Sequence, residues 1–254
     1  MNAEQQGMYV YGVVRADADI GHLAQHNGDG APEVELVEAG DLAALITPAG
    51  GDDEASVRES VLAHARVLER ATETATVVPM RFGMVFPDAE TVGSDLLDAR
   101  HDALVGLLDQ LEGHVQMTLK VAYHEEAVLR DIVAGEPEIA RLREATSEGS
   151  EQETYDARVR LGELINAAIE QRRQGDGQEI LSSIDSLTVA TTSEAAESEF
   201  MVLNAPLLVE RERVSELEDT LEQLAQERLE LMAFRLLGPM PAYHFVSWEQ
   251  PAWA

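Results

Sequence analysis

The chain has 254 residues, and its 48 acidic side chains against 18 basic ones give a formal net charge of −30. It contains no cysteine, which excludes disulfides, thiolate metal sites and cysteine nucleophiles. Because so acidic a chain has no basic patch to release counterions from a phosphate backbone, we expect no nucleic-acid partner.

The source of the acidic excess has two competing explanations. Lys120 is the only lysine, and every other basic residue is an arginine. Adaptation to a salt-rich cytoplasm accounts for this, because the Debye length is about 3 Å at 1 M salt and self-repulsion is then screened. Mimicry of nucleic acid, or binding of a basic partner, explains the charge but not the general loss of lysine. The composition therefore favours salt adaptation.

The sequence shows no sign of export or of a membrane span. The N-terminus lacks a charged segment followed by an apolar one, and no apolar run approaches about 18 residues. We expect a soluble, cytoplasmic protein without membrane contact. Its length and 45% hydrophobic content favour two modest domains over one large one.

The first half of the chain alternates strand and helix patterns. β-Branched, aromatic or alternating residues predict strands at 8–15, 34–38, 42–47, 77–86 and 115–123, with a hairpin joining the second and third. Apolar residues at helical spacing predict helices at 52–71 and 91–111. These elements predict an N-terminal α+β domain over residues 1–123.

The second half begins with helices and returns to mixed structure. Residues 124–182 are predicted to be helical, with breaks at 146–150 and at 175–177. Beyond them the patterns predict strands at 187–189, 200–209, 229–237 and 243–248, and a helix at 214–224. The continuous apolar run at 200–209 indicates a central strand buried on both faces. Residues 124–254 are thus a second domain, with a small α+β unit at 183–248 and a short tail.

One segment, residues 77–86, places an arginine within an otherwise nearly apolar run. Burying a guanidinium without a partner is costly, so Arg81 is expected to have a carboxylate or carbonyl acceptor. Pro79 lacks a backbone donor and Gly83 permits unusual dihedrals, which predicts a strand that bends. Arg81 is either a structural ion-pair partner or an anion anchor for a small molecule bound between the domains. The first role is favoured.

A search for catalytic groups finds none that are complete. The only lysine follows no glycine-rich turn, so no phosphate-binding loop is present. His22 and His26 could share a helical face, but no carboxylate follows at the interval of a hydrolytic zinc site. We therefore predict no enzyme activity, no catalytic residue, no cofactor and no metal.

Aromatic residues make up only 5% of the chain and gather in a few places. Tyr9 and Tyr11 share one face of the first predicted strand, and Phe82 and Phe86 flank the predicted bend. The third group is C-terminal and comprises Tyr243, Phe245, Trp248 and Trp253. These residues are either core or part of a docking surface for another protein.

In combination, four segments resemble the gas vesicle accessory family GvpL/GvpF. They are residues 10–14 (Val-Tyr-Gly-Val-Val), 78–86 (Val-Pro-Met-Arg-Phe-Gly-Met-Val-Phe), 204–209 (Asn-Ala-Pro-Leu-Leu-Val) and 238–246 (Gly-Pro-Met-Pro-Ala-Tyr-His-Phe-Val). The closing motif of that family usually reads Gly-Pro-Trp-Pro-Pro-Tyr, so Met240 and Ala242 depart from it.

The resemblance implies a non-enzymatic role in building gas vesicles. It implies two α+β domains, the first ferredoxin-like with an antiparallel sheet, and localisation at the gas vesicle. The implied partners are the main shell protein, whose aggregation the chain would limit, and other accessory proteins. The composition is similar to that of a haloarchaeal protein. The candidate structural or partner-binding residues are Pro79, Arg81, Phe82, Gly83, Phe86, Gly238, Pro239, Pro241, Tyr243 and Phe245.

Overall fold

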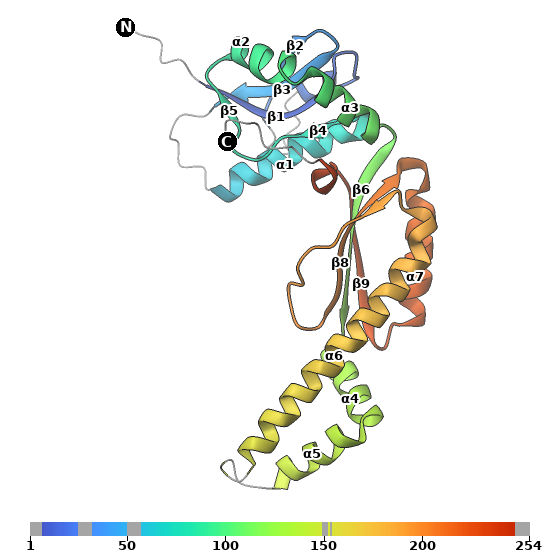
Figure 1. The fold of residues 1–254 in the computed structure, drawn as a ribbon. Helices are drawn as coiled ribbons and strands as arrows, with labels where there is room; N and C mark the ends of the chain where they lie inside the picture. The colour runs from blue at the N-terminus through green and yellow to red at the C-terminus, as the bar shows by residue number, and fades with distance from the viewer. Residues whose placement is uncertain (1–6, 25–31, 50–56, 149–151, 153, 247–254) are drawn as a thin grey trace. The chain divides into compact units, whose positions relative to one another are not determined.

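A computed structural model describes residues 7–24, 32–49, 57–148, 152 and 154–246 (Figure 1). The chain divides into two compact units. The first comprises the described residues up to Gln116 together with those from Pro239 onward, and the second is Met117–Gly238. The chain therefore leaves the first unit and later returns to it.

The first unit contains a five-stranded antiparallel sheet. Its strands are β1 (Met8–Arg15), β2 (Glu35–Ala39), β3 (Leu42–Pro48), β4 (Val78–Pro79) and β5 (Val85–Phe86). They lie in the order β2-β3-β1-β4, and β5 also pairs with β1. This is the ferredoxin-like order, with the 3-10 turn η1 (Gly21–Ala24) in place of the first helix. The predicted β2–β3 hairpin is confirmed, with Gly40 at a φ of 61° in its turn.

Helices cover both faces of this sheet (Figure 1). On one face α1 (Val57–Thr74) shares a core with Tyr11, Val14 and Leu45. The π-helical segment η2 (Val92–Asp98) and α3 (His101–Leu111) pack on the other face. Covering on both sides explains why β1 and β3 are apolar in nearly every position.

The single helix predicted at 91–111 is wrong in detail. A short α2 (Ala89–Thr91), capped by the carboxylate of Asp88, leads into η2, and α3 begins only at His101. The wider π turn places two consecutive leucines, Leu96 and Leu97, in the core. An α-helical spacing cannot anticipate such a widening.

The second unit has a four-stranded sheet of order β7-β8-β6-β9. Its strands are β6 (His114–Tyr123), β7 (Ala190–Thr191), β8 (Met201–Glu210) and β9 (Met232–Met240). The inner position and near-complete burial of β8 confirm the central strand predicted there. The predicted boundary at residue 123 differs from this division, because β6 pairs within the second sheet and not the first.

The helices of the second unit are α4 (Glu125–Gly135), α5 (Pro137–Glu148), α6 (Tyr155–Ile184) and α7 (Val214–Glu227). The predicted break at 175–177 is wrong, because α6 continues through both glycines. A Cβ added at Gly177 would lie 3.2 Å from Leu203 Cδ2. That glycine therefore serves close helix–sheet packing instead of ending the helix. Of the break predicted at 146–150, residues 149 and 150 lie outside the described residues, while α5 ends at Glu148.

Two further strand predictions are corrected. The strand predicted at 187–189 is preceded by the 3-10 turn η3 (Asp185–Leu187) and starts only at Ala190. The segment between the strands predicted at 229–237 and 243–248 is itself partly strand, because β9 continues to Met240. The strand predicted at 243–248 is the 3-10 turn η5 (Tyr243–Phe245), and Trp248 and Trp253 lie outside the described residues. A third short turn, η4 (Arg211–Arg213), precedes α7. No helix in the described ranges is long and apolar enough to span a membrane.

Candidate partner-binding site

The segment from β4 to β5 forms one edge of the first sheet. The backbone N–H of Met80 donates to Tyr11 O at 2.8 Å, and that of Val10 donates to Met84 O at 3.0 Å. Between these bonds the chain turns away from β1 at Phe82 and Gly83, where Gly83 has a φ of 89°. The predicted bend is therefore confirmed. Pro79 lies at the sheet edge, where a missing donor costs least.

The prediction that Arg81 is buried is wrong. Its side chain is exposed, and within the described residues it has no carboxylate partner. The bend explains the difference, because it turns Arg81 and Phe82 outward after the buried Met80. The structural ion-pair role is thereby overturned, and the alternative role of Arg81 as an anion anchor for a small molecule stays a prediction.

An aromatic cluster lies beneath the bend. The ring centroid of Tyr9 is 4.8 Å from that of Tyr11 and 6.2 Å from that of Phe82. His64, from α1, stacks on Tyr11 at 5.5 Å and meets the edge of Phe82 at 5.8 Å. The hydroxyl of Tyr9 accepts the N–H of Gly83 at 3.1 Å and lies 2.8 Å from His64 Nδ1. Accepting from Gly83 leaves the Tyr9 proton available for His64 Nδ1.

Burial sets the protonation of this cluster. It lowers the pKa of His64, because the charged imidazolium would lose its hydration among the rings, although a backbone contact with Met80 opposes the shift. Burial likewise raises the pKa of Tyr9 and of Tyr11. The cluster is neutral around pH 7, and the relay from Gly83 through Tyr9 to His64 holds the bend in place.

Exposed apolar side chains surround the bend, and we name them the Phe82 surface. Each is at least 42% exposed. They are Val57, Val61, Phe82 and Val85. Val61 and Val57 precede His64 by three and seven residues and so lie on its side of α1, while Val85 pairs with Tyr9 across the strands. The surface therefore joins α1 to the sheet edge through the aromatic cluster.

The closing motif is divided between strand and turn. Gly238 and Pro239 are exposed in β9, Pro241 is buried, and Phe245 is half-buried in η5. The remaining aromatic of the bend segment, Phe86, is half-buried in β5.

Gln116 holds η5, the 3-10 turn at the end of the closing motif. It is fully buried, and its Oε1 accepts the backbone N–H of His244 at 3.0 Å. Tyr243 is 37% exposed, and the partial burial of its ring, with the charge of Glu69 and the nearby Tyr9, raises its pKa. Tyr243, remote in sequence, thus lies in the same electrostatic neighbourhood as the aromatic cluster.

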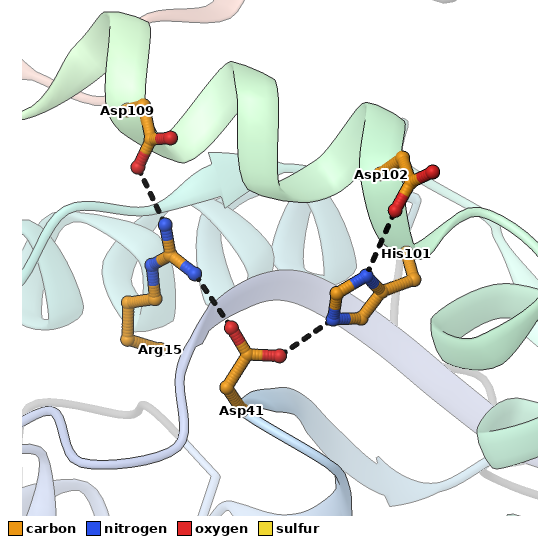
Figure 2. Close-up of polar contacts among 5 residues, drawn as sticks. All are labelled: Arg15, Asp41, His101, Asp102 and Asp109. Atoms are coloured by element: carbon orange, nitrogen blue, oxygen red, sulfur yellow. Dashed lines mark hydrogen bonds and ion pairs between the residues drawn. The ribbon is translucent and has the colours of Figure 1, made fainter.

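A polar network lies at the other end of β1 (Figure 2). Arg15 donates to Asp41 at 2.8 Å and also pairs with Asp109 of α3. His101 lies between two carboxylates, with Nε2 2.6 Å from Asp41 and Nδ1 3.2 Å from Asp102. The carboxylates raise the pKa of His101, and the hydrogen bond from His101 lowers that of Asp41. The two carboxylates thus favour the charged form of His101.

The network borders a hollow of about 680 Å³, whose lining includes Arg15, Asp41 and Asp109 but not Arg81. No group of three or more histidine and acidic side chains in the described ranges is placed to hold a metal ion. Sequence patterns did not reveal this network, because its members come from β1, the β2–β3 turn and α3 and form no motif. It ties these three elements together.

The fold and its surfaces define a class: an α+β protein of two helix-covered antiparallel sheets, with an exposed apolar patch on a ferredoxin-like unit. The chain belongs to the GvpL/GvpF family, described as gas vesicle synthesis protein GvpL/GvpF, which matches residues 7–247.

Individual relatives agree with this membership. Gas vesicle protein F of Streptomyces sp. (strain CB03234) is 32% identical over 240 residues, covering 94% of this chain and 99% of the relative. Gas vesicle protein L of the same strain is 28% identical and covers 94% and 92%. The crystal structure of the gas vesicle protein GvpF from Anabaena sp. PCC7120 superposes with a TM-score of 0.81 at 21% identity, covering 96% of this chain and 100% of that one. The predicted family and the α+β fold class are therefore confirmed.

Proposed function

We propose that this protein is a non-enzymatic assembly factor of gas vesicles. It binds the main shell protein, together with other accessory proteins, through the Phe82 surface during nucleation of the vesicle, and so limits aggregation of the shell protein. Membership of the GvpL/GvpF family supports the setting. The observation that carries the proposal is the Phe82 surface, a set of large apolar side chains left exposed on a chain of net charge −30.

The Phe82 surface is apolar, whereas most of the chain around it is acidic. Exposed apolar patches rimmed by polar residues mark protein contacts, and aromatic anchors dominate their binding energy. Phe82 is such an anchor, because the ring contacts of Tyr9 and His64 hold it without burying it. A held side chain loses little conformational entropy on binding. The acidic remainder of the chain keeps the protein and a bound apolar subunit in solution.

The test is capture of each separately expressed vesicle component by the immobilised protein in molar salt. We expect capture of the main shell protein, and a drop of about tenfold or more in affinity for the double variant Phe82→Ser/Val61→Ser, because an anchor and its apolar neighbour are lost. The matched control is Val189→Ser/Leu229→Ser, which removes two more exposed apolar side chains, these from the second unit. Full capture by the first double variant would refute the proposed site.

The same preparations address the competing small-molecule hypothesis. Binding of a metabolite, detected as a rise in melting temperature that disappears in Arg81→Ala, would favour that hypothesis if the chain captured no vesicle component.

A further inference from the structure

The strand β9 forms an open edge of the second sheet. It stands at the end of the order β7-β8-β6-β9, so among the described strands only β6 pairs with it. Within the second unit this edge runs from Met232 to Gly238, whereas β7 at the opposite edge has only 2 residues. The free N–H and C=O groups of such an edge are a template to which another extended segment can add.

A groove of about 250 Å³ lies beside this edge, where α7 runs along the sheet next to β9 (Figure 1). We name it the β9 groove. Its apolar lining comes from β6, α7 and β9 and comprises Met117, Leu119, Leu221, Ala225, Phe234 and Leu236. Phe234 and Leu236 are only half-buried. The groove therefore leaves apolar surface uncovered next to unpaired backbone groups.

Two carboxylates give the β9 groove a negative charge. Glu218 and Glu222 line it, both are exposed, and within the described residues neither pairs with a cation. No basic side chain of the described ranges lines the groove. Arg235 of β9 lies on the opposite face of the sheet from Phe234 and Leu236, because side chains alternate along a strand. The charge of the groove is thus left for a partner to neutralise.

The separation of the two carboxylates matches the repeat of a strand. Glu218 and Glu222 are about 6 Å apart along the axis of α7, at about 1.5 Å per residue. Alternate residues of a strand point to the same face and are about 6.6 Å apart. Since α7 and β9 both run along the groove, basic side chains at alternate positions of an added strand would lie opposite the two carboxylates.

We infer that a partner protein adds an extended segment to the open edge of β9, and that two arginine or lysine side chains at alternate positions of this segment enter the β9 groove. Their aliphatic stems cover the half-buried Phe234 and Leu236. Their charged ends form charge-assisted hydrogen bonds with Glu218 and Glu222. This surface belongs to the second unit, so the inference goes beyond the proposed function and does not depend on the Phe82 surface.

A second copy of this chain does not offer such a segment in extended form. The Arg-x-Arg triplets of the sequence are residues 141–143, 158–160 and 211–213, and they lie in α5, α6 and η4. The single lysine is not two residues away from any arginine. The occupant is therefore a different protein.

The first test compares two capped peptides of the same composition and charge, Thr-Val-Arg-Val-Arg-Val-Thr and Thr-Val-Arg-Arg-Val-Val-Thr. Only the first places both arginines on one face of a strand. At about 0.15 M KCl we expect it to bind the full chain about tenfold more tightly than the second. Equal binding would overturn the inference, because it would show attraction to the net charge alone.

Two variants locate the binding. Glu218→Gln/Glu222→Gln should remove the preference for alternating arginines. The matched control, Glu125→Gln/Glu126→Gln, makes the same change at exposed residues of α4 and should alter the preference by no more than about twofold. An equal loss in both variants would overturn the inference. Because all four side chains are exposed, both variants are expected to fold, which thermal melting checks.

Strand addition is tested on the wild type without any substitution. The N–H groups of alternate residues in a strand point to opposite sides, so N-methylation of the arginines and N-methylation of the valines block different edges of the peptide. One of the two methylated peptides should bind and the other should not, and binding should slow amide exchange in β9. Equal behaviour of the two peptides, or unchanged exchange in β9, would overturn strand addition.

The Phe82 surface provides the separation from the proposed function. Phe82→Ser/Val61→Ser should bind the alternating peptide as the wild type does. Loss of peptide binding in that variant would overturn the assignment to the β9 groove, whereas loss of shell-protein capture alone concerns only the proposed function.

Discussion

Each end of β1 lies beside a histidine, but the two histidines have different surroundings. At the Tyr9 end, a histidine lies among aromatic rings, and the residues around it leave apolar surface exposed. At the Arg15 end, another histidine lies among carboxylates, and every polar contact is made within the unit (Figure 2). The same residue type has its pKa lowered in one place and raised in the other. Environment, and not residue identity, decides the charge at each end.

The two ends of β1 also differ in role: one joins elements of the fold, and the other leaves a surface exposed. The Arg15 network joins β1, the β2–β3 turn and α3 through side chains that satisfy one another. The relay at the Tyr9 end joins Gly83, Tyr9 and His64, but it leaves the ring of Phe82 44% exposed. The exposed apolar surface at the Tyr9 end is therefore the surface that a partner would cover.

The largest expected effect is on stability, from His64→Ala. The substitution removes a side chain with only 5% relative exposure, and it leaves the Tyr9 hydroxyl without its His64 partner. We expect a loss of about 2–4 kcal/mol in the free energy of unfolding, measured with urea. His101→Ala, at the exposed end, should cost clearly less, because exposed ion pairs contribute little. Similar losses in the two variants would remove the distinction between a buried and a solvated histidine.

A smaller effect is expected for the relay itself. Tyr9→Phe deletes only the hydroxyl, so Gly83 N–H and His64 Nδ1 both lose their partner. We expect a loss of about 1–2 kcal/mol and faster amide exchange at Gly83. Tyr11→Phe is the matched control, since its hydroxyl contacts Thr47 and not Gly83 or His64. If amide exchange at Gly83 is unchanged in Tyr9→Phe, the hydroxyl does not hold the bend.

The smallest effects are the pH dependences, which should have opposite signs. The folded pKa of His64 is lowered by burial, so the unfolded chain binds the proton more readily and stability falls as the pH drops below about 6.5. The folded pKa of His101 is raised by Asp41 and Asp102, so its contribution is complete below about 6.5 and is lost as the pH rises through the folded value.

Thermal melting over a pH series tests both signs. The wild type should lose ground to His64→Gln on acidification, and its advantage over His101→Gln should shrink on alkalinisation. Parallel curves for the two variants would show that the environments do not differ as proposed.

The local elements of the fold were largely predictable from the sequence. Alternation and apolar runs located β1, the β2–β3 hairpin and β8, and helical spacing located α1 and α7. Pro79 and Gly83 correctly predicted a bent edge. These succeed because periodicity and backbone restriction act within a few residues.

The errors share one cause. Gly177 indicated a break, but contact with Leu203 turns it into a packing position within α6. β6 follows the first unit along the chain but pairs with β8 and β9. Arg81 was expected to be buried because its sequence neighbours are apolar, yet the bend turns it outward. In each case the deciding neighbour is far away in sequence.

By itself, the sequence determined the family, the acidic character and most strands and helices, since motif, composition and periodicity are properties of the chain. Only the tertiary structure decided which aromatic side chains are buried, that Arg81 stands beside an exposed Phe82, and that His64 and His101 have opposite pKa shifts. The reason is that burial, hydrogen bonding and local charge depend on residues brought together from α1, α3 and the strands, and no window of the sequence contains them all.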